Sequence, residues 1–275
     1  MSSNASHLPS SLILVGAGKM GGSMLEGWLK VGMKPEGVTV LDPKPSEEMN
    51  RFCREKGIAL NSAHPAVADV LVLAIKPQML DEAAPALNSL VGPQTLIVSI
   101  LAGKTIGDVR SRIPLAGAVV RAMPNLPASI GRGATGAAVN DRVSESQRLT
   151  ADALLSSNGI VEWLPSEDLI DAVTALSGSG PAYVFHLVEC LAEAGTAAGL
   201  PPDLAQRLAR ATVTGAGELL FQSDLSPATL RQNVTSPGGT TAAALEVLMR
   251  DPDGLKALMR EAVAAAKRRA EELAG

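Results

Sequence analysis

The sequence predicts an α/β fold with a doubly wound, mostly parallel sheet in its N-terminal part and an all-helical C-terminal part. Up to residue 165, short and continuously apolar runs alternate with helical stretches, which is typical of parallel strands joined by right-handed crossovers. Beyond residue 165 no run has a strand pattern, and alanine- and leucine-rich helical sequence is interrupted by glycine and proline. We therefore expect a flexible N-terminus at 1–10, a sheet domain at 11–165 and a helical domain at 166–275.

The expected strands are the apolar runs of the first part, and the stretches between them are long enough for crossover helices. Strands are predicted at 11–16, 38–42, 70–75, 95–100, 117–123, 133–140 and 159–164. Crossover helices are predicted at 19–31, 45–56 and 78–90.

Composition and charge exclude several classes of protein. Hydrophobic residues make up 46% of the chain and aromatic residues 2%, so the core must be aliphatic. A net charge of −4 offers no basic surface for nucleic acid. The two cysteines and three histidines are scattered, without the spacing of a metal site or a disulfide framework. We expect no metal, no disulfide and no nucleic-acid partner.

The start of the chain and its apolar runs bear on localisation. The first eleven residues are polar and lack the basic start and apolar segment of a signal peptide. No apolar run reaches the ~18 residues that a membrane-spanning helix needs. We therefore expect a cytoplasmic protein that has no membrane partner.

A glycine-rich motif follows the first expected strand directly. The run Gly16-Ala17-Gly18-Lys19-Met20-Gly21 has the GxGxxG pattern and opens the first expected helix. In a Rossmann domain the first glycine permits the tight turn, the second lets a pyrophosphate approach and the third allows close helix–strand packing. The motif by itself is weak, but its place in the first βαβ unit predicts a dinucleotide site on residues 16–21.

Asp42 ends the second expected strand, 21 positions after Gly21. A carboxylate there commonly accepts hydrogen bonds from the adenine-ribose hydroxyls of NAD, and its charge would oppose the 2′-phosphate of NADP. Lys44 lies two residues further on and could offset that charge. The choice between NAD and NADP therefore stays open, as does the alternative that Asp42 is a solvated turn residue.

Two other strand ends carry residues that could face a ligand. Lys76 follows the third long strand and Asn125 the fifth, and open α/β sheets bind ligands beyond the carboxyl ends of their strands. Each signal is weak alone, and Lys76 could equally be a solvated loop residue.

The helical part has a candidate anion site. The run Ser236–Thr241, Ser-Pro-Gly-Gly-Thr-Thr, precedes a helical stretch at 242–249. Its glycines leave backbone N–H groups uncovered, and the positive end of a helix dipole favours an anion such as a carboxylate. The alternative is an ordinary helix cap made by Thr240 or Thr241.

One helix of this part, at 183–198, has a narrow polar stripe that includes His186 and Glu189, while the rest of its surface is apolar. Such a helix is normally buried on most sides. A helical domain of this kind would expose apolar surface if it stood alone, so we expect a partner subunit. His186 is better explained as a stripe residue than as a catalytic one.

Five motifs, in order, resemble those of pyrroline-5-carboxylate reductases. Three are N-terminal, namely GAGKMG, AIKPQ and RAMPNLPASIGRG, and two are C-terminal, ALSGSGPAY at 175–183 and VTSPGGTT at 234–241. The two C-terminal motifs are the more specific, and the resemblance covers about residues 11–273. It implies a Rossmann domain followed by a helical dimerisation domain, with dimers that often assemble further. It also implies reduction of 1-pyrroline-5-carboxylate to L-proline with NADPH or NADH.

The resemblance also implies roles for single residues. The dinucleotide would lie on Gly16, Gly18, Lys19, Met20 and Gly21, beside Ala74, Lys76 and Pro77, with Asn125 toward the nicotinamide. The substrate carboxylate would meet the turn formed by Ser236, Gly238, Gly239, Thr240 and Thr241, and the Thr241 hydroxyl would reach the ring nitrogen. Many bacterial members have a polar or basic residue in place of Asp42, which leaves the cofactor preference open.

Two other functions are alternatives to imine reduction. A β-hydroxyacid dehydrogenase needs a proton donor or acceptor, usually a lysine or histidine, and such enzymes keep a lysine on a helix of the second domain. This chain has no lysine between Lys104 and Lys256, and His186 is the only histidine in that half. A cyclic imine can arrive protonated, so its reduction needs no such group. A non-catalytic dinucleotide sensor would keep GAGKMG but would have no use for SPGGTT.

Overall fold

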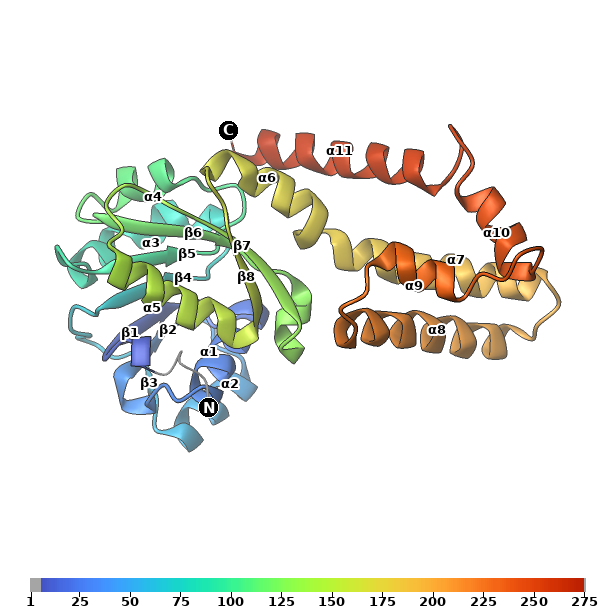
Figure 1. The fold of residues 1–275 in the computed structure, drawn as a ribbon. Coiled ribbons are helices and arrows are strands. Elements are labelled where there is room, and N and C mark those ends of the chain that lie inside the picture. Colours follow the sequence, from blue (N-terminus) through green and yellow to red (C-terminus); the bar gives the residue numbers. More distant parts are fainter. Residues whose placement is uncertain (1–5, 275) are drawn as a thin grey trace. The chain divides into compact units, whose positions relative to one another are not determined.

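The computed structural model describes residues 6–274, which form two compact units (Figure 1). The first unit comprises the chain up to Gly178 together with the residues from Ala266 onward, and the second comprises Ser179–Ala265. Residues 1–5 of the expected flexible segment lie outside the described part, and Leu8 packs against the core of the first unit.

The first unit is built on one sheet of eight strands in the order β3-β2-β1-β4-β5-β6-β7-β8. The strands are β1 Leu12–Val15, β2 Val38–Leu41, β3 Ala59–Leu60, β4 Val70–Leu73, β5 Leu96–Ser99, β6 Ala118–Met123, β7 Gly133–Val139 and β8 Gly159–Trp163. Neighbouring strands are parallel except for the antiparallel pair β6–β7. All seven predicted strands are confirmed; β3, only two residues long, was not predicted.

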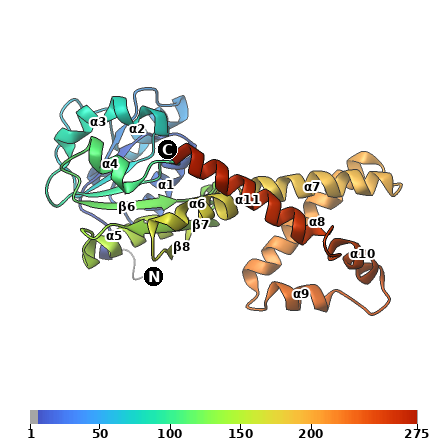
Figure 2. The same cartoon turned by 90° about the horizontal axis from the view of Figure 1, so that it is seen from above.

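Helices cover both faces of this sheet. They are α1 Lys19–Lys30, α2 Glu47–Lys56, α3 Leu80–Leu87, α4 Ile106–Arg112, α5 Glu145–Leu155 and α6 Ile170–Val173. One hydrophobic cluster joins the sheet to α1, α2 and α5, and a second joins its other face to α3 and α4. Figure 2 shows α4 and α5 on opposite faces of the strands. The prediction of a doubly wound sheet is confirmed.

The helices α4 and α5 were not predicted, although each has a clear N-terminal signal. Thr105 and Asp108 form a capping box at the start of α4, and Ser144 and Gln147 form another at the start of α5. In a capping box each of the two residues satisfies a backbone N–H of the other, so two N-terminal N–H groups of each helix are paired.

The strand order places the ligand crevice of the sheet. Because β2 and β3 lie on one side of β1 while β4 and β5 lie on the other, the order reverses between β1 and β4. Doubly wound sheets bind ligands beyond the carboxyl ends of the strands at this reversal. The glycine-rich motif follows β1, so the fold places it at this point.

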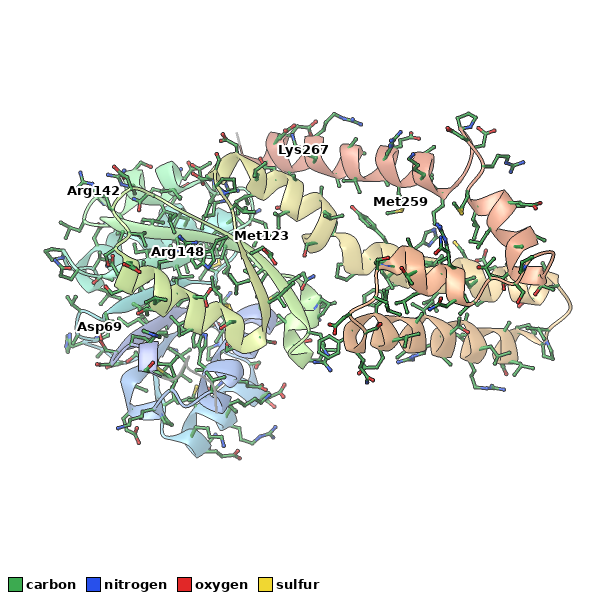
Figure 3. The ribbon with its side chains drawn as sticks, viewed as in Figure 1. Asp69, Met123, Arg142, Arg148, Met259 and Lys267 are labelled. Atoms are coloured by element: carbon green, nitrogen blue, oxygen red, sulfur yellow. The ribbon has the colours of Figure 1, made fainter. Side chains whose placement is uncertain are left out.

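Residues 166–178 pack with the first unit, although the sequence pattern changes at 165. Ile170 is fully buried in a small cluster with Met123, which Figure 3 labels. Glu167 accepts a hydrogen bond from the buried Arg121 at 2.9 Å. Because these contacts continue to Gly178, the compact units divide there, and a boundary at 165 stays a prediction.

The second unit is entirely helical. It contains α7 Gly180–Ala197, α8 Pro202–Gln222, α9 Pro227–Asn233, α10 Thr240–Leu248 and the first part of α11 Leu255–Ala274. Helices α7 and α8 pack closely where Gly195 faces Ala205. In Ser179–Ala265 the only buried apolar side chains are Ala205 and Ala209.

The helix at 183–198 is exposed in the single chain, which agrees with the expectation that a helical domain of this kind leaves apolar surface exposed without a partner subunit. No residue of α7 is buried, and Phe185 is 56% exposed. The apolar surface that was expected to need a partner is therefore exposed on this helix.

Within residues 6–274, no helix is long and apolar enough to cross a membrane. The same residues contain no group of three or more histidine, cysteine, aspartate or glutamate side chains placed to hold a metal ion. Both cysteines are free thiols; Cys190 is exposed, and burial raises the pKa of Cys53.

Candidate active site

The three glycines of the motif meet three different steric demands. Gly16 has a φ of +90°, and a Cβ there would lie 2.7 Å from the backbone oxygen of Ala74. A Cβ on Gly21 would lie 2.2 Å from the backbone oxygen of Gly16. At Gly18 a Cβ would have no atom within 4 Å. The first and third glycines are therefore required by the turn and by packing, and the second leaves open space.

The N-terminus of α1 faces this open space without a cap. Gly18 is the N-cap residue, makes no side-chain cap bond, and no acidic residue lies in the first turn. The first intrahelical bond of this turn runs from the Gly22 N–H to the Gly18 oxygen. The N–H groups of Lys19, Met20 and Gly21 stay outside that ladder, and such groups bind phosphate oxygens in dinucleotide folds. A pyrophosphate fits this site.

Asp42 is hydrogen-bonded to the glycine turn. Its Oδ2 atom accepts the N–H of Ala17 at 2.9 Å, and its Oδ1 atom accepts the N–H of Lys44 at 2.9 Å. Asp42 is therefore more than a solvated turn residue, because it joins the end of β2 to the motif after β1. Each carboxylate oxygen keeps a lone pair that could accept a ribose hydroxyl.

Asn61 was missed by the sequence reasoning. Its Oδ1 atom accepts the N–H of Asp42 at 2.9 Å, and its Nδ2 atom donates to the Asp42 backbone oxygen at 2.7 Å. Its φ of 51° is left-handed, a conformation that asparagine adopts more readily than most residues. The sequence feature that could have indicated Asn61 is its place directly after a short apolar run.

The motif after β4 lies on the other side of the same crevice. Ala74 contacts the glycine turn closely enough to exclude a side chain at Gly16. Lys76 is exposed and precedes a 3₁₀ turn at Pro77–Met79, and Pro77 is half-buried. Ala74 is therefore brought against the motif, whereas the Lys76 side chain extends into solvent.

Asn125 lies two residues after the end of β6, and its side chain makes hydrogen bonds within the first unit. Its Nδ2 atom donates to Ser177, and its Oδ1 atom accepts the N–H of Ala134 at 2.9 Å. It lies at the predicted edge of the sheet, but its polar atoms are directed at protein atoms.

The turn before α10 has the features of an anion site. Gly238 has a φ of +69°, and the N–H of Gly239 bonds to the Ser236 oxygen at 3.0 Å. The N-cap residue is Gly239 and makes no side-chain cap bond, so the expected alternative of a cap by Thr240 or Thr241 is not what forms. Thr241 is half-buried in the first helical turn. This turn belongs to the second unit and the glycine-rich motif to the first.

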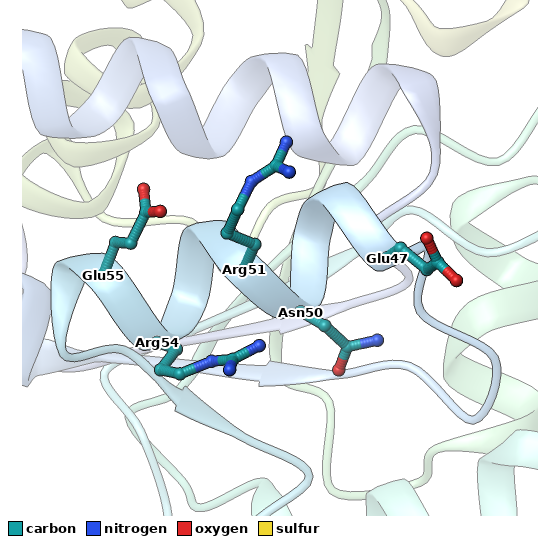
Figure 4. Close-up of a pocket in the computed structure, with 5 residues that line it drawn as sticks. All are labelled: Glu47, Asn50, Arg51, Arg54 and Glu55. Carbon is teal, nitrogen blue, oxygen red and sulfur yellow. The ribbon is translucent and has the colours of Figure 1, made fainter.

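A hollow of about 520 Å³ lies elsewhere, on the exposed side of α2 (Figure 4). Its lining comes from that helix alone and consists of Glu47, Asn50, Arg51, Arg54 and Glu55. One helix face does not enclose a ligand, and the hollow contains none of the predicted site residues. We assign no function to it.

An uncapped helix at the switch point of a doubly wound sheet, together with a second helical unit, defines a dinucleotide-dependent oxidoreductase. Residues 167–273 match the family described as pyrroline-5-carboxylate reductase dimerisation. Residues 11–103 match NADP oxidoreductase, coenzyme F420-dependent.

Individual relatives agree with these matches. The pyrroline-5-carboxylate reductase of Pseudomonas aeruginosa is 40% identical over 266 residues, which is 96% of each chain. A Coxiella burnetii structure of this enzyme superposes with a TM-score of 0.89 at 34% identity, covering 97% of this chain and 99% of that one. The Plasmodium falciparum structure, solved with NADP bound, has a TM-score of 0.75 at 27% identity and covers 96% and 98%.

The chain belongs to the pyrroline-5-carboxylate reductase family, which confirms the resemblance read from its motifs. It is an NAD(P)H-dependent oxidoreductase, and its matched dimerisation region implies a homodimer. The roles of the single site residues stay predictions.

Proposed function

We propose that this chain catalyses the reduction of the ring C=N bond of 1-pyrroline-5-carboxylate with NAD(P)H, which gives L-proline and completes proline biosynthesis. The observation that carries the proposal is a 40% identity to a pyrroline-5-carboxylate reductase over 96% of both chains. The two most specific motifs, at 175–183 and 234–241, both lie within the matched region.

The first unit holds the cofactor. Its pyrophosphate would accept hydrogen bonds from the uncapped N–H groups at Lys19, Met20 and Gly21, in the space left free at Gly18. Ala74 and Pro77 would line the opposite side of the crevice, with Lys76 available to an outlying phosphate. Asp42 would face the adenine ribose. When bound, the nicotinamide supplies the hydride.

Asn125 would lie at the nicotinamide end, because it follows β6 at the same sheet edge. Its contribution there is one of position, since its amide bonds to Ser177 and Ala134.

The turn from Ser236 to Thr241 holds the substrate carboxylate. Backbone N–H groups at Gly238 and Thr240, at the positive end of the α10 dipole, suit a carboxylate. The absence of a side-chain cap at this helix supports the role, because no side chain occupies its N-terminal donors.

Thr241 would contact the ring nitrogen. Its hydroxyl can donate or accept, so it can follow that nitrogen as it changes from planar to tetrahedral. Because the imine can bind already protonated, the protein needs to orient the imine carbon and exclude side reactions, without supplying a proton.

The preferred cofactor depends on Asp42 and Lys44. The Asp42 carboxylate favours the ribose diol of NADH, whereas the exposed Lys44 could pair with the 2′-phosphate of NADPH. We propose that both cofactors are used. We also propose a cytoplasmic location and a homodimer that can assemble further.

A kinetic matrix tests the proposal. NADPH and NADH are each combined with 1-pyrroline-5-carboxylate and with a panel of 3-hydroxy acids, the latter in the presence of the oxidised cofactors. We expect cofactor oxidation only with the cyclic imine. Turnover of a hydroxy acid together with inactivity on the imine would contradict the proposal and favour a β-hydroxyacid dehydrogenase.

A further inference from the structure

The segment between the two units contains a backbone carbonyl whose usual helical donor is missing. Residues Thr174–Gly178 form a π-helical turn, and α7 begins at Gly180. In an α-helix the oxygen of Ser177 would accept the N–H of residue 181, which is Pro181 and has none. The next N–H, that of Ala182, bonds instead to the Ser179 oxygen at 3.0 Å.

Asn125 supplies the missing donor. Its Nδ2 atom lies 3.2 Å from the Ser177 backbone oxygen and 3.1 Å from the Ser177 Oγ atom. Asn125 is 9% exposed, so water does not readily replace its amide. An unpaired buried carbonyl is costly, and a side-chain N–H removes that cost.

Ala134 completes the arrangement. Its N–H bonds to Asn125 Oδ1 at 2.9 Å, and its backbone oxygen accepts the Ser177 hydroxyl at 3.2 Å. Asn125, Ala134 and Ser177 thus form a closed ring of hydrogen bonds that joins the end of β6, the start of β7 and the π-turn. All three residues lie in the first unit.

We propose that Asn125 is a positioning residue that replaces the amide hydrogen absent at Pro181 and so fixes the π-turn at the ligand edge of the sheet. The RAMPN and SGSGP motifs are then coupled. Pro181 of SGSGP lacks the N–H that the Ser177 oxygen would accept, and Asn125 of RAMPN donates in its place. π-Turns of this kind occur frequently at functional sites.

The consequence for the reaction rests on the proposed function. The π-turn is the last part of the first unit before the chain enters the unit that carries Ser236–Thr241. Loss of the Asn125 bond should therefore disturb the orientation needed for hydride transfer more than it disturbs dinucleotide binding, which the glycine turn provides.

A double-mutant cycle on the full-length protein tests the proposal. Asn125→Ala, Pro181→Ala and the double variant are compared for kcat, for the Kd of NADPH without substrate, and for the melting temperature. Pro181→Ala restores an N–H at residue 181 and so makes the Asn125 donor redundant. Asn125→Ala removes the amide's hydrogen bonds to Ser177 and from Ala134. We expect it to lower kcat by about tenfold, while the Kd changes by less than about twofold. In the Pro181→Ala background the same substitution should cost clearly less in kcat and in melting temperature.

Two results would overturn the proposal. Equal losses in both backgrounds would show that the two motifs are uncoupled. A large rise in the Kd of NADPH at unchanged kcat would make Asn125 a direct cofactor contact. If Asn125→Ala does not fold, Asn125→Asp replaces it in the cycle, because it keeps the acceptor for Ala134 and loses the donor. Failure of the proposed function would appear separately, as a wild-type protein inactive on the imine, and the melting temperatures would still measure the coupling.

Discussion

The two units of this chain bury apolar surface very differently. The first has a sheet with a hydrophobic cluster on each face, in which large side chains such as Trp28 and Leu71 are fully buried. In the second, Ser179–Ala265, the only buried apolar side chains are two alanines, while Phe185 is 56% exposed and Leu258 63% exposed. The first unit therefore completes its own core, and the second does not.

The difference shows where each part of the function depends on the assembly. Many large apolar side chains exposed on a helical unit are typical of a protein interface, and the matched dimerisation region agrees with this. We infer that dinucleotide binding is a property of the single chain, while the substrate side is stable only in the dimer.

The largest effect is expected from a charge on the helical surface. Phe185→Glu should prevent dimerisation and abolish turnover, because a buried unpaired carboxylate at an interface costs several kcal/mol. Sedimentation analysis and a kcat measurement check this.

Leu115→Glu is the matched control, since Leu115 is also 56% exposed but lies in the first unit. It should leave both the dimer and the turnover unchanged. An active, monodisperse monomer of the Phe185→Glu variant would remove the distinction between the units.

Within the first unit, Gly21→Ala and Gly18→Ala should separate folding from cofactor binding. A Cβ at Gly21 would lie 2.2 Å from the Gly16 oxygen, so this change should destabilise the unit by about 1–3 kcal/mol. Gly18→Ala meets no protein atom within 4 Å. It should keep the melting temperature and raise the Kd of NADPH by about tenfold, or about 1.4 kcal/mol. A Gly18→Ala variant with normal Kd would place the pyrophosphate elsewhere.

In the second unit, Thr241→Ala should lower both kcat and kcat/KM. A neutral hydrogen bond contributes about 0.5–1.5 kcal/mol and one to a charged group about 1.5–3, so the loss should be about ten- to a hundredfold. The Kd of the dinucleotide should change little. Ser236→Ala is the contrast, because a carboxylate contact present throughout the reaction mainly affects KM. Intact kinetics with a lower melting temperature would make Thr241 a structural residue only.

The smallest effect concerns cofactor choice. Asp42→Asn keeps an acceptor for the Ala17 N–H and removes the charge, whereas Asp42→Ser also shortens the side chain. Both should weaken NADH relative to NADPH by about three- to tenfold, since the like charge near a 2′-phosphate disappears. Michaelis constants for the two cofactors measure this. Equal changes for NADH and NADPH would show that Asp42 supports the glycine turn without facing the ribose.

Features with a local cause could be predicted from the sequence. Strands buried on both faces need continuous apolar runs, so all seven longer strands could be recognised in the sequence. Strand β3 could not, because two residues are too few to form a pattern. The demands on Gly16 and Gly21 follow from a turn of six residues, so their roles were also predictable. The pattern of α7 also predicted that a single chain would leave its apolar surface exposed, but it could not say which surface of a partner covers this helix.

The sequence by itself determined the fold class, the glycine turn and the family, because short apolar runs and contiguous motifs encode them. Only the tertiary structure decided the partners of Asp42 and Asn125. Asn61 lies 19 residues from Asp42, and Ser177 lies 52 residues from Asn125. A buried polar group must be satisfied, but any donor that the fold brings within about 3 Å can do it. Which donor that is depends on the folded geometry, and the spacing of residues along the chain does not record it.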